Sequence, residues 1–299
     1  MTEIHEVGAE RADEVLALIR TSFADRPALD PPATALQETL ESVAAALAEH
    51  GGLVATYDGE PVGALLFRAE GRLLGLRRVG VLASARRHGI ASLLAKRAEF
   101  VARQRGFAGL RLEARAELPS TVAFWQGHGY VETDREGTRL HLQRLLPTEL
   151  TLPTPEDTQR AGHALGSLLH AGDLVILTGD LGAGKTTFTQ GLGDGLGVRG
   201  PITSPTFVIS RVHPSLVGGP GLIHVDAYRL GDAAELDDLD LDTDVDEAVT
   251  VVEWGSGLAE ALSNDRLELA LTRAADDVRT LTITPVGGRW AAVDLGSLV

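Results

Sequence analysis

The sequence contains no cysteine, only two lysines and few aromatic residues, which make up 4% of the chain. Without cysteine there can be no disulfide, no thiol nucleophile and no zinc–thiolate centre. No apolar run approaches the roughly 20 residues that a membrane-spanning helix needs, and residues 1–6 lack the basic-then-apolar pattern of a signal peptide. We therefore expect a cytoplasmic protein that makes no membrane contact.

The acidic charge of the chain is unevenly distributed. Its 299 residues carry a net charge of −15, with 44% hydrophobic and 23% charged residues, a composition typical of a globular chain with room for two domains. Residues 1–147 contain 18 basic and 19 acidic residues, whereas residues 148–299 contain 9 and 23. Because neutralisation of phosphates dominates affinity for nucleic acid, we expect the acidic half to contact a protein partner rather than RNA.

A domain boundary is predicted near residues 147–155, where Pro147, Pro153 and Pro155 interrupt helical continuation and the composition turns acidic. The expected domains are therefore residues 1–147 and 148–299. Hydrophobic spacing in the first predicts helices over 12–22, 34–50, 89–105 and 120–128, strands over 53–57, 61–68, 73–82 and 110–114, and a terminal strand pair. In the second it predicts helices over 156–170 and 184–196, and strands over 174–178, 207–211, 222–226, 249–253, 267–271 and 280–284. Both halves are expected to be α/β domains.

A glycine-rich phosphate loop joins the predicted strand 174–178 to the helix that follows. It reads Gly179-Asp180-Leu181-Gly182-Ala183-Gly184-Lys185-Thr186-Thr187, which is the G-x-x-x-x-G-K-T pattern in the strand–loop–helix context it requires. Backbone N–H groups would surround the phosphates, Lys185 would bridge the terminal phosphates, and the Thr186 hydroxyl would ligate Mg²⁺. We expect ATP or GTP to bind these nine residues of a P-loop NTPase-like α/β domain; a chance glycine-rich turn is the alternative.

Two carboxylates stand where predicted strands end. Asp226 closes the strand over 222–226, and Glu253 closes the strand over 249–253. The carboxyl ends of strands in such sheets face the nucleotide, and Mg²⁺ needs further oxygen ligands. Both residues are therefore candidates for holding the metal or ordering water, and a solvated loop carboxylate is the alternative for each.

Four motifs in this half resemble those of the TsaE (YjeE) family in their order and spacing. They are the phosphate loop, Ser204-Pro205-Thr206-Phe207, His224-Val225-Asp226-Ala227-Tyr228-Arg229-Leu230, and Glu253-Trp254. The resemblance covers residues 150–299. It implies a P-loop ATPase needed to form threonylcarbamoyladenosine at position 37 of tRNA, acting on a TsaB–TsaD complex and meeting tRNA only indirectly.

The same resemblance implies roles for individual residues. Thr186 and Glu253 would hold Mg²⁺, and Asp226 would support catalysis together with Lys185. Trp254 and Thr158 would lie near the nucleotide, and residues 204–207 would form a nucleotide-sensitive loop. The acidic run over 231–247 is most simply a solvated face, with a docking surface or a lid as the alternative.

A second anion-binding pattern, Arg86-Arg87-His88-Gly89-Ile90-Ala91, lies between a predicted strand and helix of the first half. Backbone N–H groups at a helix N-terminus can bind a pyrophosphate; a helix start with surface arginines is the alternative. Residues 3–145 resemble the GNAT N-acetyltransferase family through this pattern, through residues 112–116 and through residues 124–130. The resemblance implies a mixed sheet flanked by helices, with these six residues around the pyrophosphate of acetyl-CoA and the backbone of Val79 and Val81 along its pantetheine.

Two residues depart from the GNAT pattern. Leu118 stands where the family has asparagine, and Trp125 stands where it often has the tyrosine that protonates the leaving thiolate. Tryptophan has no acid–base chemistry at neutral pH, so we predict a packing role for Trp125. Glu113 aligns with a glutamate used as general base, and an outward-facing strand glutamate is the alternative.

The two resemblances together imply a bifunctional chain that uses ATP, Mg²⁺ and acetyl-CoA. Its first domain would transfer acetyl to an amine that the sequence does not identify, and its second would be the ATPase. Three alternatives stay open: an acetyltransferase with a regulatory P-loop domain, an ATPase with a degenerate docking module, and a small-molecule kinase in the second half.

Overall fold

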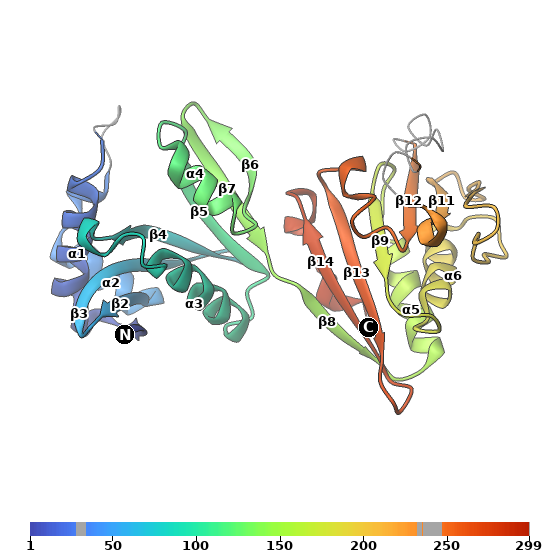
Figure 1. Ribbon diagram of the computed structural model, residues 1–299, viewed down its shortest axis with the longest axis horizontal. Helices are drawn as coiled ribbons and strands as arrows, with labels where there is room; N and C mark the ends of the chain where they lie inside the picture. The colour runs from blue at the N-terminus through green and yellow to red at the C-terminus, as the bar shows by residue number, and fades with distance from the viewer. Residues whose placement is uncertain (28–33, 232–234, 236–246, 299) are drawn as a thin grey trace. The chain divides into compact units, whose positions relative to one another are not determined.

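The computed structural model describes residues 1–27, 34–231, 235 and 247–298. The chain divides into two compact units, Met1–Leu146 and Pro147–Val299, called here the N-terminal and the C-terminal unit (Figure 1). Most of the acidic run over 231–247 lies outside the described residues. None of the described helices is both long enough and apolar enough to cross a membrane.

The N-terminal unit is built on a seven-stranded mixed sheet in the order β1-β2-β3-β4-β5-β7-β6. Only β4 and β5 are parallel; the other neighbouring pairs are antiparallel. The strands are β1 (Thr2–Val7), β2 (Gly52–Tyr57), β3 (Glu60–Glu70), β4 (Leu73–Val81), β5 (Gly109–Arg115), β6 (Val131–Glu136) and β7 (Arg139–Leu145). The helices are α1 (Ala12–Ala24), α2 (Leu40–His50), α3 (Ile90–Gln104) and α4 (Pro119–Gln126).

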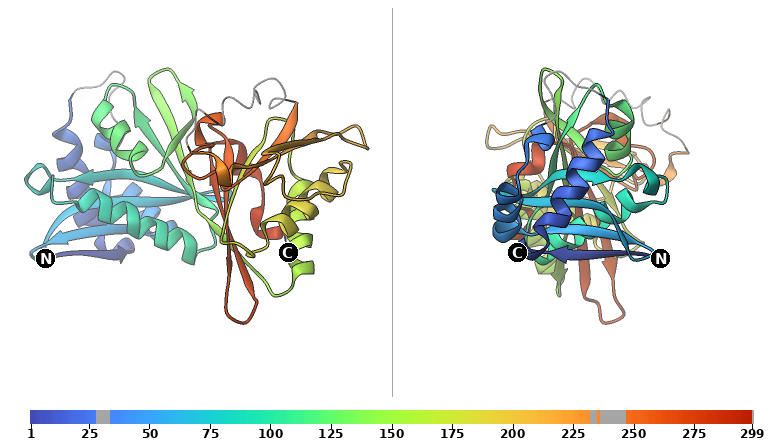
Figure 2. Two further views of the ribbon diagram at one scale, coloured as in Figure 1. Left: turned by 45° about the vertical axis from the view of Figure 1, so that its right-hand side comes forward. Right: turned by 90° about the vertical axis from the view of Figure 1, so that its left-hand side faces the viewer.

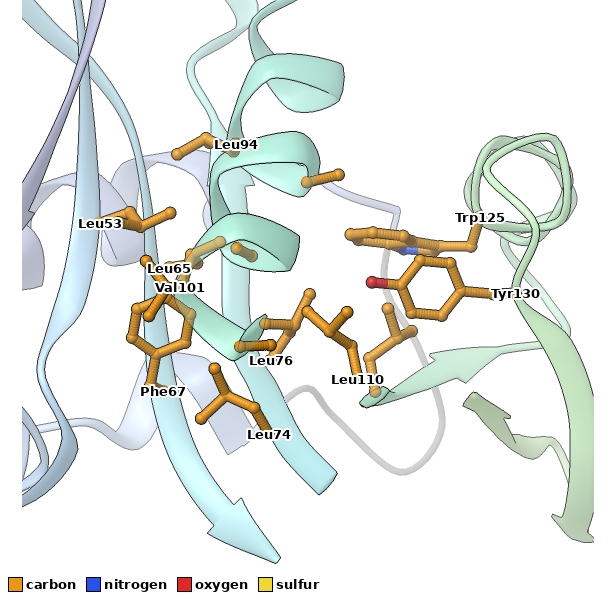
Figure 3. Close-up of a cluster of buried hydrophobic side chains, with 14 of the residues drawn as sticks. Leu53, Leu65, Phe67, Leu74, Leu76, Leu94, Val101, Leu110, Trp125 and Tyr130 are labelled. Carbon is orange, nitrogen blue, oxygen red and sulfur yellow. The ribbon is translucent and has the colours of Figure 1, made fainter. Parts of the chain in front are cut away.

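Helices cover both faces of this sheet, each over its own apolar cluster. Side chains of α1 and α2 pack with inward-facing residues of β2 and β3 such as Val54 and Leu66. Side chains of α3 and α4 pack with the opposite face, around Phe67, Leu76 and Leu110 (Figure 3). The predicted mixed sheet flanked by helices is confirmed.

Two predictions for this unit fail at the first strand and the second helix. The strand β1 was not predicted, because its polar residues leave half of it exposed at the sheet edge. The helix predicted over 34–50 is split into a 3₁₀ turn (Thr34–Gln37) and α2. The split occurs because Thr39 and Ser42 form a reciprocal capping box that starts α2 at Leu40.

Strands β4 and β5 pair over only part of their length. The pairing of β4 with β5 runs only from Leu73 and Gly109 to Leu76 and Leu112, although both strands continue. Beyond this point β4 bulges against β3, and Arg78 takes the left-handed φ of 57°. Bulges of this kind redirect a strand and are common next to functional sites.

The C-terminal unit also contains a seven-stranded sheet, in the order β10-β11-β12-β9-β13-β14-β8. Its centre, β11-β12-β9-β13, is parallel, and the outer pairs are antiparallel. The strands are β8 (Thr148–Leu152), β9 (Leu174–Thr178), β10 (Ser210–His213), β11 (Gly221–Asp226), β12 (Ala248–Glu253), β13 (Arg266–Arg273) and β14 (Arg279–Val286). The helices are α5 (Pro155–Gly166) and α6 (Lys185–Leu196), and β13 and β14 form a long hairpin (orange-red in Figure 2). The predicted α/β class is confirmed.

Two strands of this unit differ from the prediction. The strand predicted over 207–211 begins only at Ser210, because the N–H groups of Val208 and Ile209 turn back to the carbonyl of Pro205. The proline-rich boundary region contains β8, which pairs with β14 at the sheet edge. Since β7 ends at Leu145, only Leu146 and Pro147 separate strands of two different sheets.

Helices α5 and α6 lie side by side (Figure 1), and at four positions of their contact only glycine fits. A Cβ added to Gly162 or Gly166 of α5 would lie 2.2 Å from a carbonyl oxygen of α6. One added to Gly191 or Gly195 of α6 would lie 2.0 or 2.2 Å from a carbonyl oxygen of α5. This glycine contact, made by these four residues, holds the helix that follows the phosphate loop.

Candidate functional site

The phosphate loop connects the central strand β9 to the N-terminus of α6, as its sequence context predicts. Glycine is obligatory at Gly179, where φ is 147° and a Cβ would lie 2.3 Å from the carbonyl oxygen of Leu271. Gly182 and Gly184 also have left-handed φ values, of 81° and 109°. These conformations turn the chain sharply into a helix N-terminus, whose free N–H groups favour an anion.

Lys185 is buried and held by the loop itself. Its ammonium donates to the carbonyl oxygens of Gly179 at 2.7 Å and Asp180 at 3.1 Å, and lies 4.0 Å from the ring centroid of Trp254. Burial lowers the pKa of Lys185, while the carboxylates of Glu253, Asp226 and Asp180 act in the opposite direction. The ammonium is thus held beside the loop by two carbonyl oxygens, which the oxygens of a bound phosphate would replace as its acceptors.

The parallel register brings the two predicted carboxylates to one edge of the sheet. Asp226 of β11 pairs directly with Glu253 of β12, which in turn pairs with Leu177 of β9. Both carboxylates are almost fully buried. With the Thr186 hydroxyl at the start of α6, this edge supplies the oxygen donors that Mg²⁺ prefers.

Asp226 is bonded to the loop that precedes β10. Its Oδ2 lies 2.8 Å from the Ser204 hydroxyl and 2.6 Å from the Thr206 hydroxyl, and its Oδ1 accepts from the N–H of Tyr228 at 3.1 Å. Ile209 in the same loop has a φ of 67°, a strained value for a β-branched residue. The carboxylate therefore positions residues 204–207, and it lies at the same edge of the sheet as Glu253.

A buried histidine that the sequence analysis overlooked bonds to Glu253. The Nε2 atom of His224 lies 3.0 Å from Oε1 of Glu253, and both side chains are buried. His224 stands two residues before Asp226 on β11, so that both side chains point to the same face. In the sequence, the two-residue spacing of His224 and Asp226 was the signal that could have placed the histidine on the same face as the carboxylate.

The two residues expected near the nucleotide, Trp254 and Thr158, lie in different surroundings. Trp254 follows Glu253 with a left-handed φ of 63° and packs at 5.3 Å on the ring of Tyr228. Thr158, in contrast, is completely buried in α5, and its hydroxyl donates to the carbonyl of Thr154 at 3.2 Å. The Thr158 hydroxyl is thus bonded within α5, and its place near a nucleotide stays a prediction.

Four exposed apolar side chains belong to segments that carry candidate site residues. Leu181 of the phosphate loop is 95% exposed and Phe207 is 86% exposed. Val208, which follows the loop over 204–207, and Tyr228, whose N–H donates to Asp226, are also exposed. We call these four residues the apolar rim; each belongs to a segment that carries a candidate nucleotide-site residue.

The predicted pyrophosphate loop of the N-terminal unit lies open at the start of α3. Residues 86–89 are exposed, Gly89 has a φ of 73°, and a Cβ there would meet nothing within 4 Å. Ile90 turns its side chain into the core, and Ala91 is half-buried. Arg86 forms an ion pair with Asp25 at 3.3 Å, and His88 contacts the carbonyl oxygen of Arg86 at 3.0 Å. The loop can accept an anion, since its backbone faces open space.

The backbone expected to meet pantetheine already has intramolecular donors. Arg26 donates to the carbonyl of Val79 at 2.8 Å, and Arg86 donates to the carbonyl of Val81 at 3.4 Å. Burial, followed by the charge of Arg86, lowers the pKa of Arg26 to about 10. A ligand that uses these carbonyls would compete with the arginine donors or share the oxygens with them.

The remaining residues of the N-terminal unit divide between surface and core. Glu113 is exposed on β5 and faces Arg139 at 3.6 Å. Trp125 is 4% exposed and packs edge-to-face on Tyr130 with ring centroids 5.0 Å apart (Figure 3), as its predicted packing role requires. Leu118 is the residue before α4, and its side chain makes no capping hydrogen bond to the helix. Burial raises the pKa of the Tyr130 hydroxyl, which lies in the core without a hydrogen-bond partner among the described residues.

Each unit contains a segment that matches one family model. Residues 152–281 match the family model "Threonylcarbamoyl adenosine biosynthesis protein TsaE", and residues 13–130 match that of the acetyltransferase (GNAT) family. The tRNA threonylcarbamoyladenosine biosynthesis protein TsaE of Streptomyces coelicolor is 60% identical over 142 residues, which are 46% of this chain and 96% of that protein. Its Bacillus subtilis counterpart is 41% identical over 137 residues, covering 46% and 84%.

Solved structures show likenesses to each half separately. The crystal structure of YdiB from Bacillus subtilis is 34% identical, covering 48% of this chain and 89% of that one, with a TM-score of 0.40. The PaiA N-acetyltransferase from Thermoplasma acidophilum in complex with coenzyme A is 16% identical, covering 49% and 99%, with a TM-score of 0.44.

Proposed function

The chain belongs to the TsaE family, and from this premise we propose that its C-terminal unit is the Mg²⁺-dependent ATPase of tRNA threonylcarbamoyladenosine formation. The observation that carries the proposal is the convergence of Lys185, Asp226 and Glu253 at one sheet edge beside the phosphate loop. The TsaE relatives, which are tRNA-modification proteins, support a cytoplasmic place of action.

In the proposed mechanism, the loop N–H groups and Lys185 bind the phosphates of ATP. The ammonium exchanges the carbonyls of Gly179 and Asp180 for phosphate oxygens. Thr186 and Glu253 would hold Mg²⁺, which neutralises charge on the β- and γ-phosphates when bound. Asp226 accepts hydrogen bonds from the loop over 204–207 and orients it toward the phosphates.

We further propose that the partner of this unit is a protein complex of the TsaB–TsaD type, with tRNA met only through it. The strong acidic excess of residues 148–299 disfavours a direct grip on RNA. The apolar rim supports a protein contact that would respond to the nucleotide, because each of its residues flanks a phosphate-site segment.

The test is the threonylcarbamoyladenosine content of tRNA, measured by mass spectrometry in cells whose only TsaE source is this chain. We expect Lys185→Ala to abolish the modification while the protein remains folded, because Lys185 is the one lysine in the sequence of residues 148–299. Lys96→Ala, which removes the chain's other lysine from an exposed position, should leave it unchanged. Normal modification with Lys185→Ala would refute the proposal, and an ATPase rate unaffected by added TsaB and TsaD would refute the partner.

For the N-terminal unit we propose an acetyltransferase that binds acetyl-CoA at the open start of α3 and acts on an amine. The match to the GNAT family model and the exposed loop over 86–89 support it. In this proposal Glu113 is the general base. Calorimetry with acetyl-CoA should show binding that Arg86→Ala weakens and Arg103→Ala, at the far end of α3, does not. No heat of binding from the intact protein would overturn the assignment.

A second candidate for this unit is a docking module without catalysis. The buried Trp125 and the arginine-bonded carbonyls of Val79 and Val81 favour it. The two candidates differ in acetyl transfer: release of free CoA thiol in the presence of amine acceptors is expected only from the enzyme.

A further inference from the structure

We propose that His224 is a positioning residue of the ATPase site, which orients the carboxylate of Glu253 for its metal. The inference rests on the proposed role of Glu253 as a Mg²⁺ ligand. It concerns a residue of β11 that belongs neither to the phosphate loop nor to the loop over 204–207, and that would act through its hydrogen bond to Glu253 of β12.

The hydrogen bond between His224 and Glu253 is buried. The side chains of His224 and Glu253 are 0% and 3% exposed, so that water cannot compensate the charge of the carboxylate. A buried carboxylate without a donor is costly, and among the described residues His224 is the one that donates to it. The bond at 3.0 Å between Nε2 and Oε1 therefore holds the carboxylate in a single orientation.

The bond also makes the two carboxylate oxygens different. Oε1 accepts from Nε2 of the histidine, whose other ring nitrogen, Nδ1, is buried without a hydrogen-bond partner among the described residues. The fixed carboxylate would then present Oε2 as its less engaged oxygen to a metal. Residues that hold ligands in this way commonly change metal affinity about 10- to 100-fold when they are replaced.

The experiment compares metal affinity with metal-free nucleotide affinity in the full chain. Calorimetry measures the Mg²⁺ concentration that half-saturates protein loaded with a non-hydrolysable ATP analogue, and separately the affinity for ADP in EDTA. We expect His224→Leu to raise the half-saturating Mg²⁺ concentration about tenfold without altering ADP affinity in EDTA. His224→Gln, whose amide keeps a hydrogen-bond donor, should have a half-saturating Mg²⁺ concentration close to that of the wild type.

Thr250→Val is the matched control, because it removes a buried polar atom of β12 that has no partner among the described residues and lies on the other face of the sheet. Its Mg²⁺ requirement should equal that of the wild type. If His224→Leu does not fold, His224→Asn replaces it, since the shorter amide cannot reach Oε1.

The outcomes separate this inference from the function on which it rests. A shifted Mg²⁺ requirement in Glu253→Gln beside an unshifted one in His224→Leu refutes the role of His224 alone. An unshifted requirement in Glu253→Gln refutes Glu253 as a metal ligand and this inference with it. Equal losses in the glutamine and leucine variants of His224 would also overturn the positioning role.

Discussion

Replacing Gly191 by alanine should destabilise the C-terminal unit, although alanine is the better helix former. Gly191 lies inside α6, in the glycine contact with α5. An added Cβ would lie 2.0 Å from the carbonyl oxygen of Gln159 and 2.8 Å from its carbon. Both are backbone atoms, so that no side-chain rotation can relieve the overlap and the helices must move apart.

The expected magnitude combines two opposing effects. Alanine in a helix interior gains about 0.5–1 kcal/mol over glycine, whereas overpacking of a tight contact costs about 1–3 kcal/mol. Because the overlap is with backbone, we expect the cost to prevail by about 1–2 kcal/mol. In a unit of this size that corresponds to a melting temperature lower by about 2–8 °C.

Scanning calorimetry of the full chain tests this reasoning, with the transition of the C-terminal unit identified by its upward shift on addition of ADP. Gly193→Ala is the matched control, because its Cβ would meet Ile202 Cδ1 at 2.0 Å, the end of a flexible side chain that can rotate away. We expect Gly193→Ala to melt within about 2 °C of the wild type. The reasoning fails if both variants melt at the same temperature.

Three further predictions concern other parts of the chain. Burial lowers the pKa of His213 below its ordinary 6.5, so the unfolded state binds its proton first and stability is lost as the pH falls below 6.5. The melting temperature should therefore fall more steeply between pH 7 and pH 5 in the wild type than in His213→Asn. Arg26→Ala should raise acetyl-CoA affinity about threefold in calorimetry by freeing the Val79 carbonyl, and an unchanged affinity would contradict this. Trp125→Ala should lower the unfolding free energy of the N-terminal unit by about 3–5 kcal/mol in denaturant titrations, and a loss below 1 kcal/mol would mean that the residue is not a core residue.

Features carried by contiguous residues were predictable from the sequence. The phosphate loop is one run of residues between a strand and a helix, so that its pattern can be read without knowing any distant contact. Asp226 and Glu253 were predictable as a pair because parallel strands end at the same edge. Trp125 was predictable as a packing residue from its chemistry alone.

Features that depend on contacts between distant segments were not predictable. The bond from His224 to Glu253 needs the register of β11 against β12, and the donation of Arg26 to Val79 spans 53 residues. The burial of Thr158 follows from the glycine contact, because α6 approaches α5 closely enough to cover its side chain. Glycines within a helix normally weaken the prediction of that helix, and only the structure shows why α5 and α6 need them.

The position of β8 has a practical consequence for anyone who separates the two units. A fragment that starts at Pro155, where α5 begins, lacks β8 and leaves β14 as the free edge of its sheet. The stretch Thr280-Leu281-Thr282-Ile283-Thr284 is uncharged and rich in β-branched residues, a composition that pairs readily with other chains at an open edge. Such a fragment is expected to aggregate, whereas one cut before Thr148 keeps the edge strand that covers it.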